Sequence, residues 1–317
     1  MSAPAASPRV LVTPRSLTQA GLHAVPELEP LRTAGFELVA GPAGEAPSEE
    51  QLLELVPGCV GWLAGVERIG ARVLEAAPAL RVISRNGTGT DSVDLAAAQR
   101  AGVRVERAAG ANAQGVAELA LALALTALRQ VPWSAAAVRE GRWQRWRGRE
   151  LDECCVGVVG LGAIGRRVAD LFTALGARVV AHDPAVVPNH GSAVRLAGLD
   201  ELLGGCDVVT LHAPPPADGR PLLDERRLAR MPRGAVLVNT SRAALVDDAA
   251  VLAALQDGRL SAYAVDAFET EPPELSPLLR HERVIPTPHV GGFTGASMRR
   301  ATGQAVDNLL SVLREIR

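Results

Sequence analysis

The chain has 317 residues, of which 48% are hydrophobic and 21% are charged, and its formal net charge is −2. This balance is typical of a globular protein with two domains, and it gives no reason to expect a nucleic acid or a membrane as a partner. All 33 basic residues are arginine, and the absence of lysine excludes Schiff-base chemistry and a Walker-type phosphate loop.

The start of the chain, Met1 to Pro8, is rich in Ala, Ser and Pro and predicts a frayed tail. It lacks the basic start and the long apolar core of a signal peptide, so we expect a cytoplasmic protein. The longest apolar stretch, Leu119 to Leu128, is about half the length that a bilayer requires, and we read it as a buried helix. The four cysteines form no Cys-x-x-Cys pair and have no clustered histidines, so we expect no metal site.

Two blocks of short apolar runs alternate with helical patterns, which predicts parallel sheets covered on both faces. In the first block the predicted strands are Arg9 to Thr13, Phe36 to Val39, Gly58 to Leu63 and Leu80 to Ser84, and the predicted helices are Leu17 to Ala34, Glu49 to Leu55 and Gly70 to Ala77. The second block begins with a helix from Ala109 to Leu128, and its later strands are Val208 to Leu211, Ala235 to Val238, Ala262 to Asp266 and Val284 to Ile285. The tail from Gly295 to Arg317 predicts an amphipathic helix that returns to the first block. We therefore expect a discontinuous domain of residues 1–108 and 293–317, and a second domain of residues 109–292.

A glycine-rich motif opens the second block. An apolar strand from Val156 runs into Gly160-x-Gly162-x-x-Gly165, in which Ala163 and Ile164 start the next helix, and Asp183 closes the following apolar run. The first glycine allows a tight turn, the second lets the backbone approach a pyrophosphate, and the third lets the helix pack on the strand. Asp183 lies at the distance where a carboxylate accepts hydrogen bonds from ribose hydroxyls, so the motif predicts a site for NAD.

Three polar clusters follow later strands of this block: Asn239 to Arg242, Asp266 to Glu271, and Pro288 to Gly292. Open α/β sheets bind ligands at these strand ends. The guanidinium of Arg242 is suited to bind a substrate carboxylate through two parallel hydrogen bonds. A carboxylate and an imidazole at neighbouring strand ends can pair, so Glu271 would favour the protonated form of His289 and make it a general acid. Because a nicotinamide carries the hydride, these side chains need only supply a proton and orientation.

At these residues the chain resembles the D-isomer-specific 2-hydroxyacid dehydrogenase family over nearly its full length. The matching segments are Leu161 to Gly165, His182 to Pro184, Leu211 to Pro214, Met231 to Arg242, Val246-Asp247, Asp266 to Phe268 and Pro288 to Gly292. The resemblance implies two doubly wound parallel-sheet domains of Rossmann or flavodoxin type, with an active-site cleft between them. It also implies Arg242 as substrate clamp and Glu271 as partner of the acid/base His289.

The resemblance further implies residues that bind the cofactor and the substrate. Beyond the glycine motif, the expected NAD-binding residues are His212, Ala213, Pro214, Thr240, Ser241, Asp266 and Gly292. His212 could equally cap its strand. The loop Asn86, Gly87 and Thr88 is expected to present backbone N–H groups to the carboxylate of a small 2-oxo or 2-hydroxy acid.

Within the family the chain looks most like the phosphoglycerate dehydrogenases, through Ser84 to Asp94 and Gly141 to Arg145. That likeness implies that Arg85 contacts a second anionic group, as in 3-phosphoglycerate, phosphohydroxypyruvate or phosphonopyruvate. The alternative is that Arg85 only pairs with Asp91 or Asp94. The chain stops after the C-terminal helix, so we expect a short form without the regulatory domains of some phosphoglycerate dehydrogenases.

Other functions are compatible with the same residues. A glyoxylate or hydroxypyruvate reductase, or a non-catalytic NAD-sensing protein of the same fold, would share most of these features. The basic and tryptophan-rich segment Arg142 to Arg147 resembles a nucleic-acid patch, yet it follows the helix that builds dimers in the family. We favour an interface arm and expect a homodimer.

Overall fold

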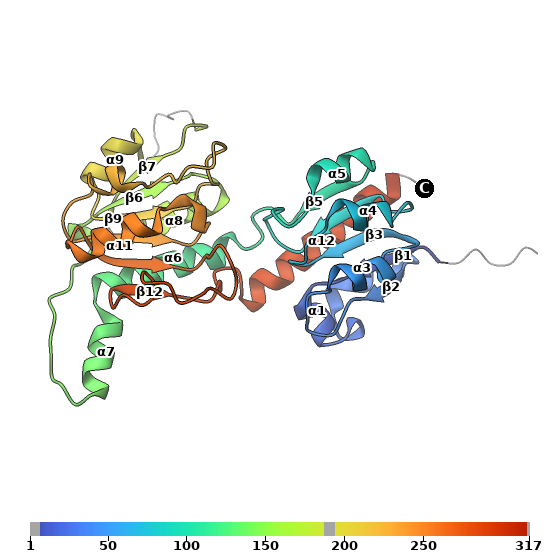
Figure 1. The fold of residues 1–317 in the computed structure, drawn as a ribbon, viewed down its shortest axis with the longest axis horizontal. Coiled ribbons are helices and arrows are strands. Elements are labelled where there is room, and N and C mark those ends of the chain that lie inside the picture. Colours follow the sequence, from blue (N-terminus) through green and yellow to red (C-terminus); the bar gives the residue numbers. More distant parts are fainter. Residues whose placement is uncertain (1–6, 187–193, 316–317) are drawn as a thin grey trace, which may run out of the picture. The chain divides into compact units, whose positions relative to one another are not determined.

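The computed structural model describes residues 7–186 and 194–315. Most of the predicted N-terminal tail and the last two residues of the predicted C-terminal helix lie outside the described residues. The chain divides into two compact units. Unit 1 consists of Met1–Asn112 and Gly295–Arg317, and unit 2 is Ala113–Thr294 (Figure 1).

Unit 1 is built on a parallel sheet of five strands in the order β2-β1-β3-β4-β5. This order places the topological switch between β1 and β3, which is the flavodoxin-like arrangement. The strands are β1 (Arg9–Val12), β2 (Glu37–Ala40), β3 (Cys59–Ala64), β4 (Val82–Arg85) and β5 (Arg104–Arg107). The helices are α1 (Arg15–Gln19), η1 (Leu22–Ala24), η2 (Pro26–Leu28), α2 (Glu29–Thr33), α3 (Glu49–Leu55), α4 (Ala71–Glu75), α5 (Leu95–Arg100) and α12 (Gly295–Glu315).

The C-terminal helix α12 completes the core of unit 1. Its apolar face, which includes Val306, Leu309 and Leu313, belongs to the same buried cluster as Val10 of β1. A Cβ atom on Gly61 would lie 3.1 Å from Leu313 and 3.4 Å from Leu309, so a residue without a side chain lets the helix approach β3 closely.

Unit 2 has a parallel sheet of seven strands in the order β12-β11-β10-β9-β6-β7-β8, the Rossmann arrangement with its switch between β6 and β9. The strands are β6 (Cys155–Val159), β7 (Arg178–His182), β8 (Arg195–Leu196), β9 (Val208–Leu211), β10 (Ala235–Asn239), β11 (Leu260–Val265) and β12 (Val284–Pro286). The helices are α6 (Ala113–Leu128), α7 (Val131–Arg139), η3 (Leu151–Glu153), α8 (Ala163–Ala174), α9 (Leu199–Gly205), α10 (Glu225–Leu228), η4 (Ala243–Leu245) and α11 (Asp248–Gln256).

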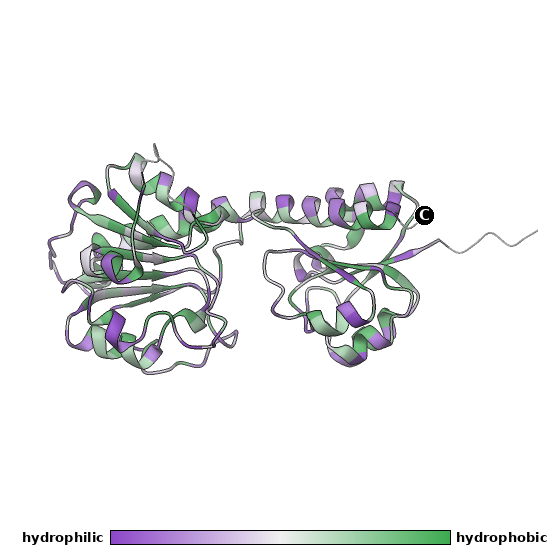
Figure 2. Cartoon of the chain, turned by 90° about the horizontal axis from the view of Figure 1, so that it is seen from above, coloured by the Kyte–Doolittle hydropathy of each residue, from purple (hydrophilic) through white to green (hydrophobic). Residues whose placement is uncertain are grey.

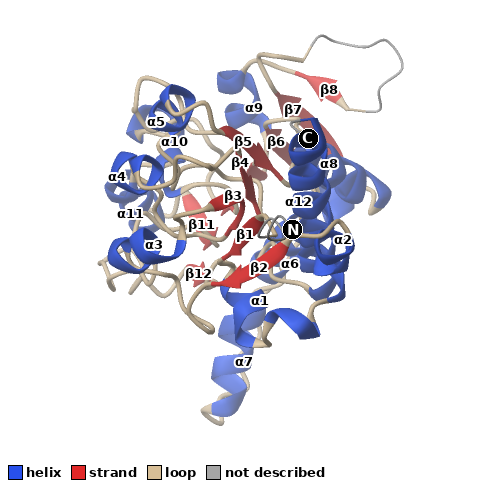
Figure 3. Ribbon diagram, turned by 90° about the vertical axis from the view of Figure 1, so that its right-hand side faces the viewer, coloured by secondary structure: helices blue, strands red, loops and turns tan. Residues whose placement is uncertain are grey.

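Each sheet is the apolar centre of its unit, with helices around it (Figures 2 and 3). In unit 2 every residue of β6, β9 and β10 is buried, and α6 packs with α8 over one face of the sheet. These near-continuous apolar strands are what a sheet covered on both faces requires. The predicted pair of doubly wound parallel-sheet domains is confirmed.

One predicted element of unit 1 is wrong. The single helix expected from Leu17 to Ala34 is broken into α1, η1, η2 and α2. Gly21 adopts a φ of 78°, which ends the first helix, and Pro26 starts a new short turn. The apolar periodicity was correct for packing, because Leu17, Leu22, Leu28 and Leu31 are all buried, but it does not require a continuous helix.

Candidate active site

The glycine turn after β6 depends on residues without side chains at two positions. Gly160 has a φ of 94°, and a Cβ there would lie 2.7 Å from the backbone of His212 and Ala213. A Cβ on Gly165 would lie 1.8 Å from the carbonyl oxygen of Gly160. Gly162 differs, because a Cβ there would meet nothing within 4 Å. The first and third glycines let the turn fold, and the second leaves open space beside the backbone.

Helix α8 begins directly after this open position, with Gly162 as its N-cap and no capping side-chain hydrogen bond among the described residues. The first-turn N–H groups have no intrahelical partner, so they present a partial positive charge to a phosphate. The Asp183 carboxylate at the end of β7 accepts hydrogen bonds from the N–H groups of Leu161, at 2.7 Å, and Ala185, at 2.9 Å. These bonds fix the carboxylate beside the glycine turn. The residues therefore fit a dinucleotide.

The loops after the neighbouring strands β9 and β10 each carry a buried polar atom that has no hydrogen-bond partner among the described residues. These atoms are Nδ1 of His212 and Oγ1 of Thr240. Each follows its strand directly, and the two strands are neighbours in the sheet. Ser241 ties the loops together, because its hydroxyl donates to the carbonyl of Ala213 at 2.8 Å. A bound ligand with polar edges would satisfy these atoms, which again fits a cofactor at this sheet edge.

His212 is a neutral histidine. Its Nε2 lies 2.8 Å from the Thr210 hydroxyl, and burial lowers its pKa from 6.5 to about 3. The sequence left open whether His212 lines the cofactor or caps its strand, and the bond to Thr210 shows it anchored to the end of β9. An imidazole with this pKa carries no charge near neutral pH, so it is a poor general acid there.

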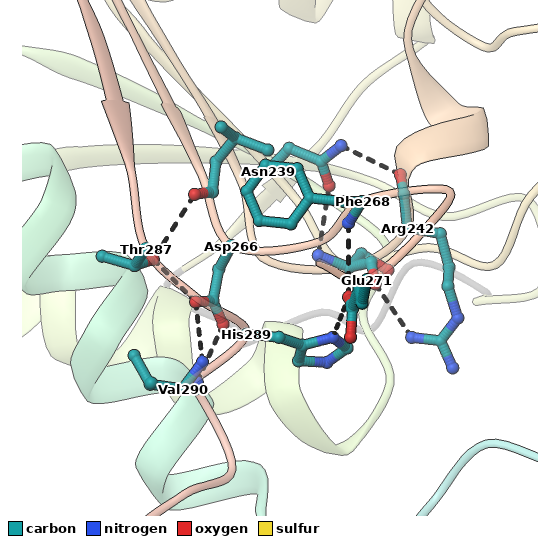
Figure 4. Close-up of polar contacts among 11 residues, drawn as sticks. Asn239, Arg242, Asp266, Phe268, Glu271, Thr287, His289 and Val290 are labelled. Carbon is teal, nitrogen blue, oxygen red and sulfur yellow. Dashed lines mark hydrogen bonds and ion pairs between the residues drawn. The ribbon is translucent and has the colours of Figure 1, made fainter. Parts of the chain in front are cut away.

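Arg242 is held by the turn that follows β10. The buried side chain of Asn239 donates from Nδ2 to the carbonyl of Arg242 at 2.9 Å and accepts from the N–H of Ser241 at 3.1 Å. The guanidinium of Arg242 donates from Nη1 to the carbonyl of Ser241 at 2.8 Å. Asn239 thus sets the direction of the turn from which the arginine projects (Figure 4).

Glu271 and His289 come from the segments after β11 and β12, which are adjacent parallel strands. Nδ1 of His289 lies 2.6 Å from Oε1 of Glu271 (Figure 4). The two side chains are 48% and 43% exposed, so the pair is open to exchange protons with a substrate or with water. Because Glu271 engages Nδ1, proton exchange at His289 is directed to Nε2.

Asp266 fastens the loop that carries His289. Its Oδ1 accepts from the Thr287 hydroxyl at 2.6 Å and from the N–H of Val290 at 2.8 Å, and its Oδ2 accepts from the N–H of Gly291 at 2.8 Å. The side chain is only 2% exposed. This loop holds His289 at a φ of 52°, a left-handed conformation that is uncommon for a residue with a side chain. The buried Asp266 carboxylate maintains that conformation through its three hydrogen bonds.

The predicted substrate loop lies in unit 1, directly after β4. Asn86, Gly87 and Thr88 are partly exposed. The hydroxyl of Thr88 donates to Oδ1 of Asn112 at 3.2 Å. The preceding residue, Arg85, is 7% exposed, and its guanidinium donates to the carbonyls of Gly89 and Ala64. Arg85 is therefore not a solvated surface residue.

The structure brings Arg242, Glu271 and His289 to the ends of three neighbouring strands of unit 2. The predicted cofactor residues lie on the same edge, either in the glycine turn or in the loops after β7, β9, β10, β11 and β12. Sequence reasoning missed the roles of Asn239, Thr287 and Thr210, whose hydrogen bonds shape this edge. A polar residue within or directly after a buried strand was the available signal for all three. Among the residues that the structure describes, no group of three or more His, Cys, Asp and Glu side chains could hold a metal ion.

No single helix within residues 7–186 and 194–315 combines the length and apolar character needed to span a membrane. The pair α6 and α7 would pass that test together, but the two helices meet at a bend of 59°.

Comparisons with known proteins agree with this geometry. Residues 121–291 match the family model described as D-isomer specific 2-hydroxyacid dehydrogenase, NAD binding domain. The chain is 40% identical over 262 residues to D-3-phosphoglycerate dehydrogenase of Mycobacterium bovis, an alignment that covers 81% of this chain and 50% of the relative. The chain thus spans about half the length of the curated relatives that it matches. The match to an NAD-binding domain confirms the predicted cofactor.

Solved structures align along almost the whole chain. The TT0316 protein of Thermus thermophilus is 38% identical, with a TM-score of 0.86 and 97% of each chain covered. A glyoxylate reductase from Paecilomyes thermophila is 26% identical, with a TM-score of 0.86 and coverage of 98% of this chain and 97% of that structure.

Proposed function

Because the chain belongs to the D-isomer specific 2-hydroxyacid dehydrogenase family, we propose that it transfers a hydride between NAD(H) and a small 2-hydroxy or 2-oxo acid. The observation that carries this proposal is the hydrogen bond of 2.6 Å between His289 and Glu271, on strand ends beside the one that bears Arg242. A cation, an acid/base pair and a dinucleotide-type glycine turn on one sheet edge are the parts that such a reaction needs.

The residues divide the work as follows. When bound, the nicotinamide supplies or accepts the hydride. Arg242 pairs with the substrate carboxylate and polarises the neighbouring carbonyl. His289 gives a proton from Nε2 to the carbonyl oxygen in reduction, and takes it back in oxidation. Glu271 fixes the ring through its hydrogen bond to Nδ1, which leaves Nε2 for the proton transfer.

Two classes of 2-oxo acid are candidates for the substrate. The first class consists of acids with a second anionic group, such as 3-phosphoglycerate, phosphohydroxypyruvate or phosphonopyruvate. The sequence prediction for Arg85 and the names of the curated relatives support this class. Glyoxylate or hydroxypyruvate is the alternative, which the name of one structural neighbour illustrates and which the burial of Arg85 supports.

A panel of 2-oxo acids tests the proposed function. Purified protein should oxidise NADH in the presence of at least one of glyoxylate, pyruvate, hydroxypyruvate and phosphohydroxypyruvate, with the loss of absorbance as the readout. NADH binding without turnover on any acid would instead support a non-catalytic NAD sensor. Failure to bind NADH would refute the assignment of the glycine turn.

We also propose that the protein acts in the cytoplasm as a homodimer. Helix α7 extends away from the sheet of its own unit (Figure 1). This helix and the segment after it expose apolar side chains, among them Val138 and Trp143, the latter 86% exposed. Exposed apolar side chains of this kind are typical of an interface. Light scattering coupled to gel filtration tests this proposal, and Trp143→Glu should shift the mass toward a monomer if the segment builds the contact.

A further inference from the structure

A buried polar cluster lies at the carboxyl edge of the unit 1 sheet, where strands β1, β3 and β4 end. Its members are Thr13, Glu67 and Arg85, each no more than 7% exposed. Glu67 accepts hydrogen bonds at Oε1 from the Thr13 hydroxyl and from the N–H of Gly65, the latter at 2.9 Å. Trp62 donates from Nε1 to the Thr13 hydroxyl at 2.8 Å. Polar groups buried this fully need a physical reason to be there.

The Ala64–Gly65 peptide joins the acid to the base. Its carbonyl oxygen accepts from Nη1 of Arg85 at 3.3 Å, and its N–H donates to Glu67 at 2.9 Å. The positive charge thus lies at the oxygen end of one peptide dipole and the negative charge at its nitrogen end. The two side chains form a charge pair linked through a single peptide group rather than by direct contact.

The electrostatic surroundings of Arg85 agree with this pairing. Burial lowers the pKa of Arg85, while the nearby carboxylates of Glu67 and Asp91 act in the opposite sense and favour its charged form. The other oxygen of Glu67, Oε2, is buried without a hydrogen-bond partner among the described residues. It lies against Gly65, where a Cβ would come within 2.7 Å of it. The carboxylate therefore occupies space that exists only because residue 65 is glycine.

We propose that Glu67 determines substrate specificity by neutralising Arg85, so that the enzyme prefers 2-oxo acids with an uncharged side chain over those with a second anionic group. This proposal rests on the proposed function, and on the expectation that the loop Asn86 to Thr88, which follows Arg85 directly, receives the substrate carboxylate. A phosphate ester carries about two negative charges near neutral pH. Beside an unpaired guanidinium it would gain charge-assisted hydrogen bonds. Beside the Arg85–Glu67 pair it meets one attraction and one repulsion of similar size, and the nearby Asp91 carboxylate adds to the repulsion.

Kinetics with a matched pair of acids test the proposal, because hydroxypyruvate and phosphohydroxypyruvate differ only in the phosphate. The wild-type protein should show the higher kcat/KM with hydroxypyruvate. Glu67→Gln keeps the shape and the hydrogen-bond acceptor but removes the charge. We expect it to shift the ratio of the two kcat/KM values toward the phosphorylated acid by about tenfold or more, mainly through KM, since a unit charge within several ångströms in a protein interior has an effect of this order.

Glu37→Gln is the control, because it removes the same charge from an exposed position at the start of β2, the opposite end of the strands. It should leave the ratio unchanged. NADH affinity, which reports on unit 2, and the thermal midpoint show whether each variant is folded. If Glu67→Gln does not fold, the wild-type ratio of kcat/KM for hydroxypyruvate to kcat/KM for phosphohydroxypyruvate alone tests the proposed preference for uncharged side chains.

The possible outcomes are distinct. A wild-type preference for phosphohydroxypyruvate, or a Glu67→Gln variant with the wild-type ratio, overturns the role of Glu67 while leaving the proposed function intact. An absence of turnover with every 2-oxo acid overturns the proposed function, and the specificity proposal falls with it.

Discussion

Removing the charge of Glu271 should slow the enzyme without weakening cofactor binding. Glu271→Gln replaces a charge-assisted hydrogen bond of 2.6 Å to Nδ1 of His289 by a neutral one. Hydrogen bonds to charged groups contribute about 1.5–3 kcal/mol, and about 1.4 kcal/mol corresponds to a factor of ten in rate. Because both side chains are nearly half exposed, solvent screening places the expected effect at the lower end of this range. We therefore expect kcat to fall by about 10- to 30-fold.

The substitution His289→Ala should lower kcat further, by about 10²- to 10⁴-fold, since it removes the proton donor itself. Steady-state NADH oxidation with the best 2-oxo acid measures both values, and NADH fluorescence titration checks that cofactor affinity is kept. Glu269→Gln removes a charge from an exposed residue two positions away and serves as the control. In the double variant, Glu271→Gln should add almost nothing to His289→Ala, because the two residues act as a unit. A His289→Ala variant within about threefold of wild-type kcat would refute the assignment of the proton donor, since loss of a general acid costs far more than that.

Three further predictions follow from the geometry of unit 2. Asp183→Ala should narrow the preference for NADH over NADPH, because the carboxylate beside the glycine turn would accept from a ribose hydroxyl and repel a 2′-phosphate; equal wild-type efficiency with both cofactors would contradict this. Gly165→Ala should abolish NADH binding or folding, since its Cβ would lie 1.8 Å from the Gly160 carbonyl oxygen, whereas Gly162→Ala should be far milder for folding; calorimetric titration and thermal melts measure the two effects. His212 has a folded pKa of about 3, so below its ordinary value of 6.5 the unfolded state binds a proton that the folded state does not, and its contribution to stability is lost as the pH falls through that window. When the pH is lowered from about 7.5 to about 5, the free energy of unfolding measured with urea should fall by about 1–2 kcal/mol less for His212→Gln than for the wild-type protein. Parallel pH profiles of the two proteins would contradict this prediction.

The sequence was sufficient to predict the parallel sheets and the strand ends that bear polar clusters. Apolar runs of four to six residues, such as those of β6 and β10, leave little choice but a sheet buried on both faces. Glycine spacing was equally informative, because the contacts of Gly160 and Gly165 leave no room for a side chain. These are local constraints, and they can be recognised from neighbouring residues.

What the sequence could not predict depends on distant partners. Glu67 reads as an ordinary charged loop residue, and only the fold places it across one peptide from Arg85. Asp266 was expected to contact the cofactor, and nothing in its local pattern shows that it fastens Thr287 and Val290 more than 20 residues later. The break after α1 is a different case, because its signals, Gly21 and Pro26, are local and present in the sequence. It was missed because the apolar periodicity of the segment was given more weight than these two residues.

The position of α12 has a consequence for synthesis on the ribosome. Residues Arg9 to Arg107 emerge first, but their sheet lacks the helix whose Leu309 and Leu313 cover Gly61. That helix appears only after all of Ala113–Thr294 has been translated, a delay of about 10–40 s at typical rates of about 5–20 residues per second. During this interval unit 2 can complete its own core, while the sheet of unit 1 exposes the apolar side chains that α12 later covers, among them Val10 and Leu63, to solvent or to a chaperone. Unit 1, whose first residues are translated before those of unit 2, can therefore complete its core only after unit 2 has been made.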